Sequence, residues 1–508
     1  MSARPASCLP LILLLLLCGL GCAHAESDDE GVAGASADAP PAITGAALEA
    51  DLLALYRGLQ AAHYDLYADR SADEYDAEFA ASRAAIRESQ SRLDAWRLLQ
   101  RFTAFGNIAH ANIAFPAKAY GAFRAAGGRT LPIYPRIDAG RIYVRENYSS
   151  VRRISAGDEI LSIDGEPAGL WLERTASYLS ADTPRIAHSL LEGRFPAYLW
   201  LVVGDRSRFT LRVRSPGSRR VRRVRVGALT GSELEAAIES APKQFELDYT
   251  ERVARMQAPG IAYLRPGPFY NAEQQQQLWD SAAFESFIDD AFADFQRAAA
   301  HTLIIDLRTN PGGDNSFSDH LVAYLADRPF RFASRFVVRS SAQAEAANRA
   351  RLDAGADLAS VSARYAAAYA KTPHGQTFDF EIPWGRPRTG KNAVDRPFGD
   401  RVYALIDRNS YSNAVNVAAI LQDYGWAIIA GEPTTDYATT LGAMERFTLP
   451  NTGFSVGFPK ALIVRPSGDE RRGGVVPDLP IPRPPTPGAT DAVLAALLSE
   501  LDAATSDR

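Results

Sequence analysis

The chain has 508 residues, of which 46% are hydrophobic and 23% are charged, and its net charge is −5. These values predict an ordinary soluble protein that is long enough for two or three domains with sizeable cores. The negative charge, and the absence of a basic stripe from the sequence, argue against nucleic-acid binding. The histidines stand singly, without the close spacing of a zinc site, so we expect neither a metal nor another cofactor.

A targeting segment opens the chain, and we expect it to cover residues 1–25. Arg4 precedes the apolar run Leu9 to Leu17, which is too short to span a membrane stably and is typical of a signal peptide. Ala23-His24-Ala25 offers a cleavage site, whereas Gly19-Leu20-Gly21-Cys22 resembles a lipoprotein box that would attach a lipid to the cysteine. Either outcome predicts an exported protein of a bacterial periplasm or outer membrane, with no membrane contact beyond such an anchor.

All three cysteines, Cys8, Cys18 and Cys22, lie in this segment. The sequence that follows therefore offers no disulfide, no cysteine nucleophile and no thiolate metal ligand. Residues 26–45 are rich in Ala, Ser, Asp, Gly and Pro, a composition that predicts a flexible tether.

Residues 46–128 are predicted to form a helical N-terminal region. Apolar residues recur there at helical spacing, which indicates two or three helices, with Ser71 and Asp94 as candidate starts. Gly106 interrupts the pattern, and His110 follows in a stretch that alternates. Taken alone, a single histidine in such a position is more typical of a structural residue than of a catalytic one.

Short strands dominate residues 129–230. The predicted strands are Tyr134–Ile137, Arg141–Val144, the start of Gly157–Glu166, Tyr198–Val203, Arg208–Val213 and Arg219–Val226. The segment Gly157–Glu166, a strand ending in an Asp-Gly turn, resembles a characteristic segment of PDZ domains, which bind extended peptide ends by adding a strand. The insertion Leu170–Pro196 is longer than usual for such a domain. Arginines alternate with valines between Arg219 and Arg225, which indicates one solvated strand face.

Two apolar strands within residues 245–485 lead into turns that can carry chemistry. Thr302–Leu307 runs into Asn310-Pro311-Gly312-Gly313, where glycines let the backbone come close to a ligand. Arg401–Ile406 ends in Ser410-Tyr411-Ser412-Asn413, at the start of an apolar helix. A serine at a strand-to-helix turn is typical of an exposed nucleophile with backbone N–H groups beside it. It is also typical of a residue that merely caps the helix.

The remaining segments of this region alternate between strands and helices, which predicts an α/β domain in an α/β (α+β) multidomain protein. The predicted elements are strand Gly260–Arg265, helix Ala272–Ala299, a largely helical insertion at about 340–398, strands Ala427–Ala430, Ala443–Leu449 and Phe454–Phe458, and a C-terminal helix, Asp491 to Leu501, within residues 486–508. His320, on the helix after the glycine turn, is expected to be structural because no acidic residue is patterned with it.

Together these segments resemble the tail-specific, or C-terminal-processing, serine peptidases, a family that includes the tricorn protease core. The resemblance covers residues 45 to 485, in the family's order. Its motifs are Asp306-Leu307-Arg308 with the glycine turn, the Ser-x-Ser turn with Leu421-Gln422-Asp423-Tyr424, the loop Gly431-Glu432-Pro433-Thr434 and the closing Gly474-Val475-Val476-Pro477-Asp478. It implies a helical N-terminal region, a PDZ-like domain and a ClpP/crotonase-like peptidase domain that acts on polypeptides.

The resemblance also assigns roles to individual residues. Ser412 would be the nucleophile, and the backbone N–H groups of Asn413 and of Gly313, or its neighbour Gly312, would form the oxyanion hole. The base differs from that of many family members, which use a lysine roughly two dozen residues after the serine. That lysine is missing, because none occurs between Lys391 and Lys460.

The tricorn-like branch of the family instead takes its base from a histidine in an N-terminal segment, and His110 matches that segment in chain order. An imidazole suits the role because its ordinary pKa lies near neutrality. The same branch has a supporting carboxylate before the closing motif. Glu470 is the candidate here, although its spacing to Gly474 departs from the family pattern.

Three hypotheses follow from the sequence. The first is an exported serine endopeptidase or C-terminal processing peptidase that works through an acyl-enzyme on Ser412. The missing lysine motivates the second, in which catalysis has been lost and the PDZ-like domain binds peptides or serves as a scaffold. The third is an esterase or other acyl hydrolase, which would apply the same chemistry to a different acyl group.

Overall fold

The computed structural model describes residues 42–353, 359–388, 398, 401–484, 486 and 488–506. The predicted signal peptide, Cys22 and the tether up to residue 41 lie outside the described residues, as does most of the end of the predicted insertion. The described chain forms two compact units. The first holds the residues up to Gln60, Leu66–Pro242 and Met444–Phe458, and the second holds Ala61–Asp65, Lys243–Ala443 and the residues from Pro459 onward.

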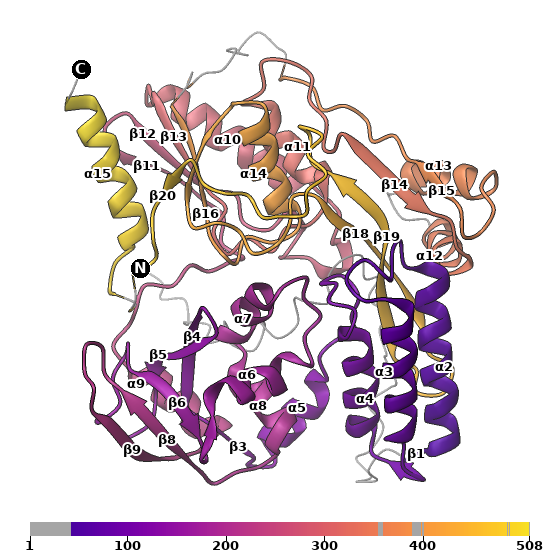
Figure 1. Cartoon of the computed structure of the whole chain (residues 1–508). Coiled ribbons are helices and arrows are strands. Elements are labelled where there is room, and N and C mark those ends of the chain that lie inside the picture. The colour runs from indigo at the N-terminus through magenta and orange to yellow at the C-terminus, as the bar shows by residue number, and fades with distance from the viewer. Residues whose placement is uncertain are drawn as a thin grey trace. The chain divides into compact units, whose positions relative to one another are not determined.

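The first unit begins with helices, as the apolar periodicity predicts (Figure 1). They are α2 (Gly45–Ala62), α3 (Ala72–Ala84), α4 (Arg92–Ala104) and α5 (Ala117–Ala125), and the short strands β1 (Ile43–Thr44) and β2 (Ser89–Gln90) pair beside them. Ser71 caps α3 in a reciprocal box with Glu74, which confirms the predicted start. The predicted start at Asp94 is wrong, because the hydroxyl of Ser91 accepts the Asp94 N–H and caps α4 three residues earlier.

An antiparallel sheet follows in the same unit, in the order β4-β5-β6-β8-β9, with β7 paired to β6. Its strands are β4 (Ile133–Asp138), β5 (Arg141–Asn147), β6 (Glu159–Ile163), β7 (Glu166–Pro167), β8 (Arg208–Arg214) and β9 (Val221–Gly227). On β9, Val224 and Val226 are buried whereas Arg223 and Arg225 are exposed. The predicted solvated arginine face is therefore confirmed. A small pair, β3 (Arg129–Thr130) with β10 (Leu229–Thr230), and helix α9 (Gly231–Ser240) complete this region.

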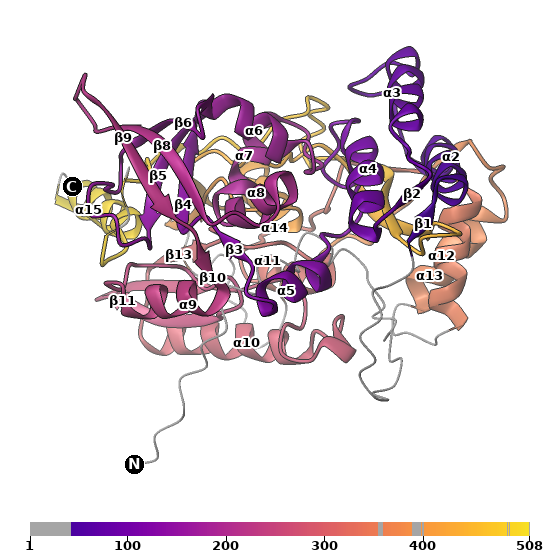
Figure 2. The ribbon, with the colours of Figure 1, turned by 90° about the horizontal axis from the view of Figure 1, so that it is seen from below.

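Three helices lie beside this sheet, and one of them corrects a predicted strand (Figure 2). They are α6 (Ala168–Ala176), α7 (Pro184–Glu192) and α8 (Phe195–Val203). The segment Tyr198–Val203, predicted as a strand, belongs to α8. Pro196 sits in the first turn of this helix, Gly204 follows its end, and its apolar residues are buried from Phe195 to Leu201. A short run that is apolar on every side carries no period, so the pattern could not separate a buried helix from a strand.

The second unit is built on a six-stranded sheet in the order β11-β12-β13-β16-β17-β20. The strands are β11 (Val253–Ala258), β12 (Ile261–Arg265), β13 (Thr302–Asp306), β16 (Val402–Ile406), β17 (Ile428–Gly431) and β20 (Leu479–Pro480). All neighbours run parallel except β11 and β12. The predicted α/β architecture is confirmed, together with the two strands expected to carry the chemical turns.

Helices cover both faces of this sheet (Figure 1). One face packs against α10 (Ala282–Arg297), α11 (Asn315–Ala323) and α14 (Asn413–Asp423), and the other against α15 (Ala492–Ser506). Successive residues of β13 belong alternately to the hydrophobic cores on the two faces. Leu303 and Ile305 lie in the first core, and Ile304 lies in the second. Burial on both sides explains the apolar run Leu303-Ile304-Ile305 in the middle of β13.

A second, four-stranded sheet has the order β15-β14-β19-β18. Its strands are β14 (Arg335–Arg339), β15 (Thr377–Asp379), β18 (Thr440–Thr448) and β19 (Ser455–Val464). The predicted insertion contains α12 (Ala342–Asp353) and α13 (Ala359–Tyr369). The helix predicted from Ala272 begins ten residues later, at Ala282, after a 3-10 turn, Gln275–Gln277. No helix within the described part of the chain is long and apolar enough to cross a membrane.

Candidate active site

Two turns meet at the carboxyl edge of the six-stranded sheet. β13 and β16 are adjacent parallel strands, with Ile305 opposite Ala404 and Asp306 opposite Leu405. Both strands end at this edge, so the glycine turn after β13 lies beside the serine turn after β16. Such an edge is where open α/β sheets place their ligand sites.

Ser412 adopts a backbone conformation that only the surrounding turn can maintain. Its φ is 53° and its ψ is −123°, in a region that non-glycine residues rarely occupy. The residue directly precedes α14, but its side chain makes no capping hydrogen bond to the helix. Its N–H instead donates to Asp436 Oδ2 at 2.6 Å. The capping interpretation is therefore wrong for Ser412, whose partly exposed side chain is left for another role.

Ser410 has the structural role that Ser412 lacks. It is fully buried, and its hydroxyl donates to the Leu307 carbonyl at 2.8 Å, across to the neighbouring turn. The same hydroxyl accepts the Asp407 N–H at 3.0 Å. The Tyr411 N–H adds a second tie between the turns, since it donates to the Asn310 carbonyl at 3.0 Å. The two serines of the Ser-x-Ser sequence thus differ in role: Ser410 links the two turns, whereas the side chain of Ser412 is partly exposed.

The glycine turn approaches Ser412 so closely that it has no room for side chains. A Cβ on Gly312, whose φ is 85°, would lie 2.6 Å from the Tyr411 carbonyl and 2.8 Å from the Cβ of Ser412. A Cβ on Gly313, whose φ is 138°, would lie 2.1 Å from the Phe269 carbonyl. Real side chains do not tolerate such contacts, so Gly312 is needed to bring this backbone against the serine turn and Gly313 to bring it against Phe269.

The backbone N–H groups around Ser412 are unequal. Gly312 donates its N–H to its neighbour Asn310, at 2.8 Å from the side-chain Oδ1. The N–H groups of Gly313 and Asn413 have no acceptor among the described residues. The Asn413 side chain is buried and its Nδ2 donates to Ser318 Oγ at 2.9 Å, which fixes this residue at the start of α14. Two N–H groups are therefore available beside one serine.

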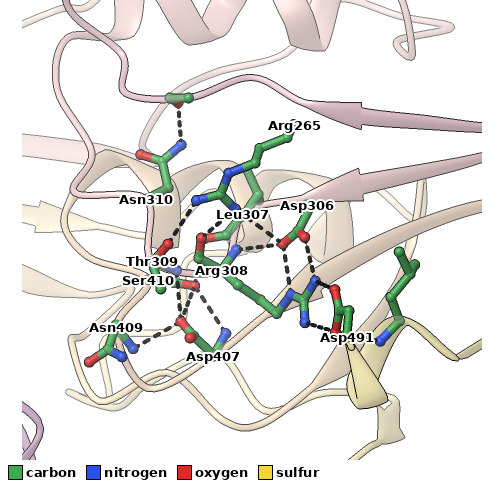
Figure 3. A network of polar contacts seen from close by, with 12 residues as sticks. Arg265, Asp306, Leu307, Arg308, Thr309, Asn310, Asp407, Asn409, Ser410 and Asp491 are labelled. Carbon is green, nitrogen blue, oxygen red and sulfur yellow. Dashed lines mark hydrogen bonds and ion pairs between the residues drawn. The ribbon is translucent and has the colours of Figure 1, made fainter. Parts of the chain in front are cut away.

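A buried ionic network surrounds Asp306 and Arg308, where β13 leads into the glycine turn (Figure 3). The Arg308 guanidinium lies between two carboxylates, 2.6 Å from Asp306 Oδ2 and 2.6 Å from Asp491 Oδ2. Arg265 adds a second cation, 3.7 Å from Asp306, and donates to the Arg308 carbonyl at 3.0 Å. Burial alone would raise the pKa of Asp306, but the two arginines outweigh it and leave that pKa lowered. The network binds β13, its turn and the C-terminal helix α15 into one body.

Asp407 anchors the serine turn, as Figure 3 also shows. Its carboxylate accepts the N–H groups of Thr309 and Asn409, each at 3.0 Å, so it holds both turns. Burial of the carboxyl raises the pKa of Asp407 despite these bonds.

Glu470 lies in the second unit and is 66% exposed. Its carboxylate pairs with Arg335 at 3.0 Å. Its neighbour Asp469 bonds to Arg471, which lowers the pKa of Asp469 to about 2.

His110 lies in the first unit, in the turn that follows α4 and Gly106. The chain on either side of it is fixed, because the Ala109 N–H donates to Asp182 at 3.3 Å and Asn112 pairs with Gly457 in both directions, at 2.7 and 3.2 Å. The side chain is partly exposed.

The structure corrects the expectation that no acidic residue accompanies His320. Its Nε2 lies 2.6 Å from Asp289 Oδ1, and the same carboxylate accepts hydrogen bonds from Tyr324 and Arg388. Asp289 is on α10, distant in sequence, so the spacing around His320 could not reveal the pair.

Asp319, on α11, is a carboxyl that the sequence did not single out. Its Oδ1 is buried and has no hydrogen-bond partner among the described residues. Its Oδ2 accepts a hydrogen bond from Asn315 at 3.0 Å. Burial, with a smaller contribution from the charge of Asp314, raises the pKa of Asp319 to about 7.

Replacing this carboxyl, Asp319→Asn, is expected to stabilise the protein much more at pH 8 than at pH 4. The unfolded carboxyl ionises near pH 4 and the folded one near pH 7, so stability falls as pH rises through that window, by up to about 4 kcal/mol. Asparagine has no proton to lose and removes this slope. Urea unfolding of both proteins at the two pH values measures the effect, and an equal difference at both would contradict it.

The chain was compared with known proteins. Residues 261–481 match the family model of peptidase family S41. The structure of mature CPAF complexed with lactacystin is similar, with a TM-score of 0.60 and 18% identity, covering 91% of this chain and 97% of that chain. Mature CPAF gives 0.58 and 19%, covering 90% and 96%. The photosystem II D1 C-terminal processing protease gives 0.39 and 14%, covering 85% and 92%. A search of the curated proteins finds no match. At this identity the CPAF structures establish a shared fold.

Proposed function

We propose that this chain, whose residues 261–481 match the family model of peptidase family S41, is a serine peptidase that cleaves polypeptides through an acyl-enzyme on Ser412. The observation that carries the proposal is the presentation of Ser412. It is held at a φ of 53° without a capping role, and the Gly313 and Asn413 N–H groups beside it are available.

In the proposed reaction Ser412 Oγ attacks the scissile carbonyl carbon while a base takes its proton. The carbonyl oxygen becomes an oxyanion that accepts hydrogen bonds from the Asn413 and Gly313 N–H groups, each worth about 2–4 kcal/mol of barrier. Gly312 is the less suitable second donor, because its N–H is already given to Asn310. The amine then leaves with the proton, and water hydrolyses the acyl-enzyme by the same steps.

We infer that His110 is the base. The support is its place in the chain, in a turn after Gly106 that resembles the histidine segment of the tricorn-like branch, together with the missing lysine after Ser412. Glu470 is proposed as the supporting carboxylate. Its exposure and its ion pair with Arg335 make it a secondary contributor.

His110→Ala is expected to lower kcat for casein hydrolysis by roughly 10⁴-fold, because the serine loses the group that takes its proton. His320→Ala is the matched control: it removes an equally partly exposed imidazole that pairs with Asp289, and kcat should stay within about twofold. Equal loss in both variants would contradict the assignment of His110.

The proposal itself is tested with the mature wild-type protein and an unstructured substrate, casein. New peptide termini should appear, and a fluorophosphonate or a β-lactone should block the activity while modifying one peptide, the one that contains Ser412. A protein that neither cleaves casein nor takes up either reagent would favour the second function, a peptide-binding protein that works through its PDZ-like sheet. The observation that supports this alternative is the missing lysine after Ser412.

The proposed place of action is outside the cytoplasm. The support is sequence alone, namely the predicted signal peptide over 1–25 and the alternative lipid anchor at Cys22. Substrates would then be exported proteins or peptides.

A further inference from the structure

We propose that Asp436 is a positioning residue, which holds the Ser412 peptide in its reactive geometry and decides which backbone N–H groups receive the oxyanion. This inference rests on the proposed function, since it concerns the same serine. Asp436 lies on the loop after β17, the parallel strand next to β16.

The bond between Asp436 and Ser412 is short and has a buried acceptor. The Ser412 N–H donates to Asp436 Oδ2 at 2.6 Å, and the carboxylate is fully buried. Hydrogen bonds to an ionised acceptor are roughly twice as strong as neutral ones, and burial strengthens them further. A non-glycine residue with a positive φ costs on the order of 1–3 kcal/mol, so a bond of this kind can offset the strain at Ser412.

Asp436 is itself held from the other side, so it does not depend on the serine for its position. Its Oδ1 accepts the Tyr437 N–H at 2.9 Å, and its main-chain carbonyl accepts the Thr434 hydroxyl at 2.9 Å. Thr434 Oγ1 in turn accepts the Val475 N–H at 2.9 Å, which ties the loop to the closing Gly-Val-Val-Pro-Asp segment. The loop after β17 and the closing Gly-Val-Val-Pro-Asp segment thus together hold the Asp436 carboxylate that binds the Ser412 N–H.

The direction of this bond has a consequence for the oxyanion hole. Since the Ser412 N–H points to Asp436, the serine cannot offer its own N–H to the oxyanion. The Asn413 N–H and the Gly313 N–H, which have no acceptor among the described residues, remain. Without Asp436 the Ser412 peptide would be free to rotate, and a displacement of about 1 Å at such a site costs roughly 100-fold in rate.

The test compares Asp436→Ala, which removes the acceptor, with Asp436→Asn, which keeps an amide oxygen in its place. Asp436→Ala should lower kcat for peptide hydrolysis, and the rate of Ser412 modification by a fluorophosphonate, by about 100-fold with KM changed less than about threefold. Asp436→Asn should recover both rates to within about tenfold of wild type. Asp436→Leu, which fills the space without an acceptor, repeats the test should the alanine variant unfold.

Asp51→Ala is the matched control. Asp51 is also a fully buried carboxylate that accepts backbone N–H groups, from Asn451 at 2.9 Å and Thr452 at 2.7 Å, but it lies in the first unit. It should lower stability toward urea while leaving kcat within about threefold. Wild-type rates in Asp436→Ala and Asp436→Leu, or an asparagine variant as slow as they are, would overturn the inference and leave the proposed function standing. A wild-type protein without hydrolysis or labelling would overturn the proposed function, and the inference with it.

Discussion

Ser412→Ala is expected to lower kcat for casein hydrolysis by roughly 10⁴-fold or more, because the acyl-enzyme can no longer form. The substitution removes a partly exposed hydroxyl that makes no capping bond to α14, so the folding free energy should change by less than about 1 kcal/mol. Initial rates of peptide release, with urea unfolding of the same samples, measure both quantities.

Ser410→Ala, two residues away, should show the opposite behaviour. It removes a buried hydroxyl bonded to Leu307 and Asp407, and leaving those groups unpaired should cost about 1–3 kcal/mol of stability. Its kcat should fall by less than about tenfold, since the presented serine remains. Hydrolysis that survives in Ser412→Ala and is lost in Ser410→Ala would reverse the assignment of the two serines.

Asp306→Ala is expected to destabilise the second unit by about 3–5 kcal/mol, the largest stability effect that we predict. The carboxylate has no exposed surface on its side chain. Its removal leaves Arg308 and Arg265 buried, with Asp491 still paired to Arg308 alone. The pKa of Asp306 is lowered, so its contribution is present above the ordinary pKa of the group and is lost as pH falls through the folded value. Urea unfolding monitored by tryptophan fluorescence near neutral pH measures the effect.

Asp294→Ala provides the control for that substitution, in the same unit and with the same residue types. Asp294 pairs with Arg297 at 2.6 Å on α10, but both side chains are more than half exposed. Exposed pairs of this kind contribute about 0–1 kcal/mol. Equal destabilisation by the two substitutions would show that burial of the Asp306 network does not set its strength.

Element types along the second unit could be predicted from sequence because each strand and helix has a strong local pattern. β13 and β16 are largely apolar and end shortly before Asn-Pro-Gly-Gly and Ser-Tyr-Ser-Asn, and the structure has turns at both places. The segment Tyr198–Val203 failed for the converse reason. It is apolar on every side, so nothing in its pattern distinguished α8 from a strand.

The candidate nucleophile and the glycine turn could also be predicted from the sequence, by their residue types and their order in the chain. A serine and a pair of glycines after two successive apolar strands are visible in any reading of the sequence, and the parallel register of β13 and β16 brings them to one edge. The sequence could not show that the Gly312 N–H donates a hydrogen bond to Asn310. That bond leaves the Gly313 N–H as the available donor for an oxyanion. A residue's type does not reveal whether its backbone N–H is hydrogen-bonded in the folded protein.

The sequence by itself predicted an α/β domain, with a candidate nucleophile in the Ser-Tyr-Ser turn and no lysine where many members of the resembled family have their base. The family resemblance already assigned the nucleophile to Ser412. Only the tertiary structure shows the role of Ser410, because its buried hydroxyl bonds to Leu307, 103 residues away in the sequence. It also decided that Asp436 holds the Ser412 peptide, through contacts between loops from separate strands. Local patterns specify strands and turns, whereas hydrogen bonds between distant turns form only once the sheet has set them side by side.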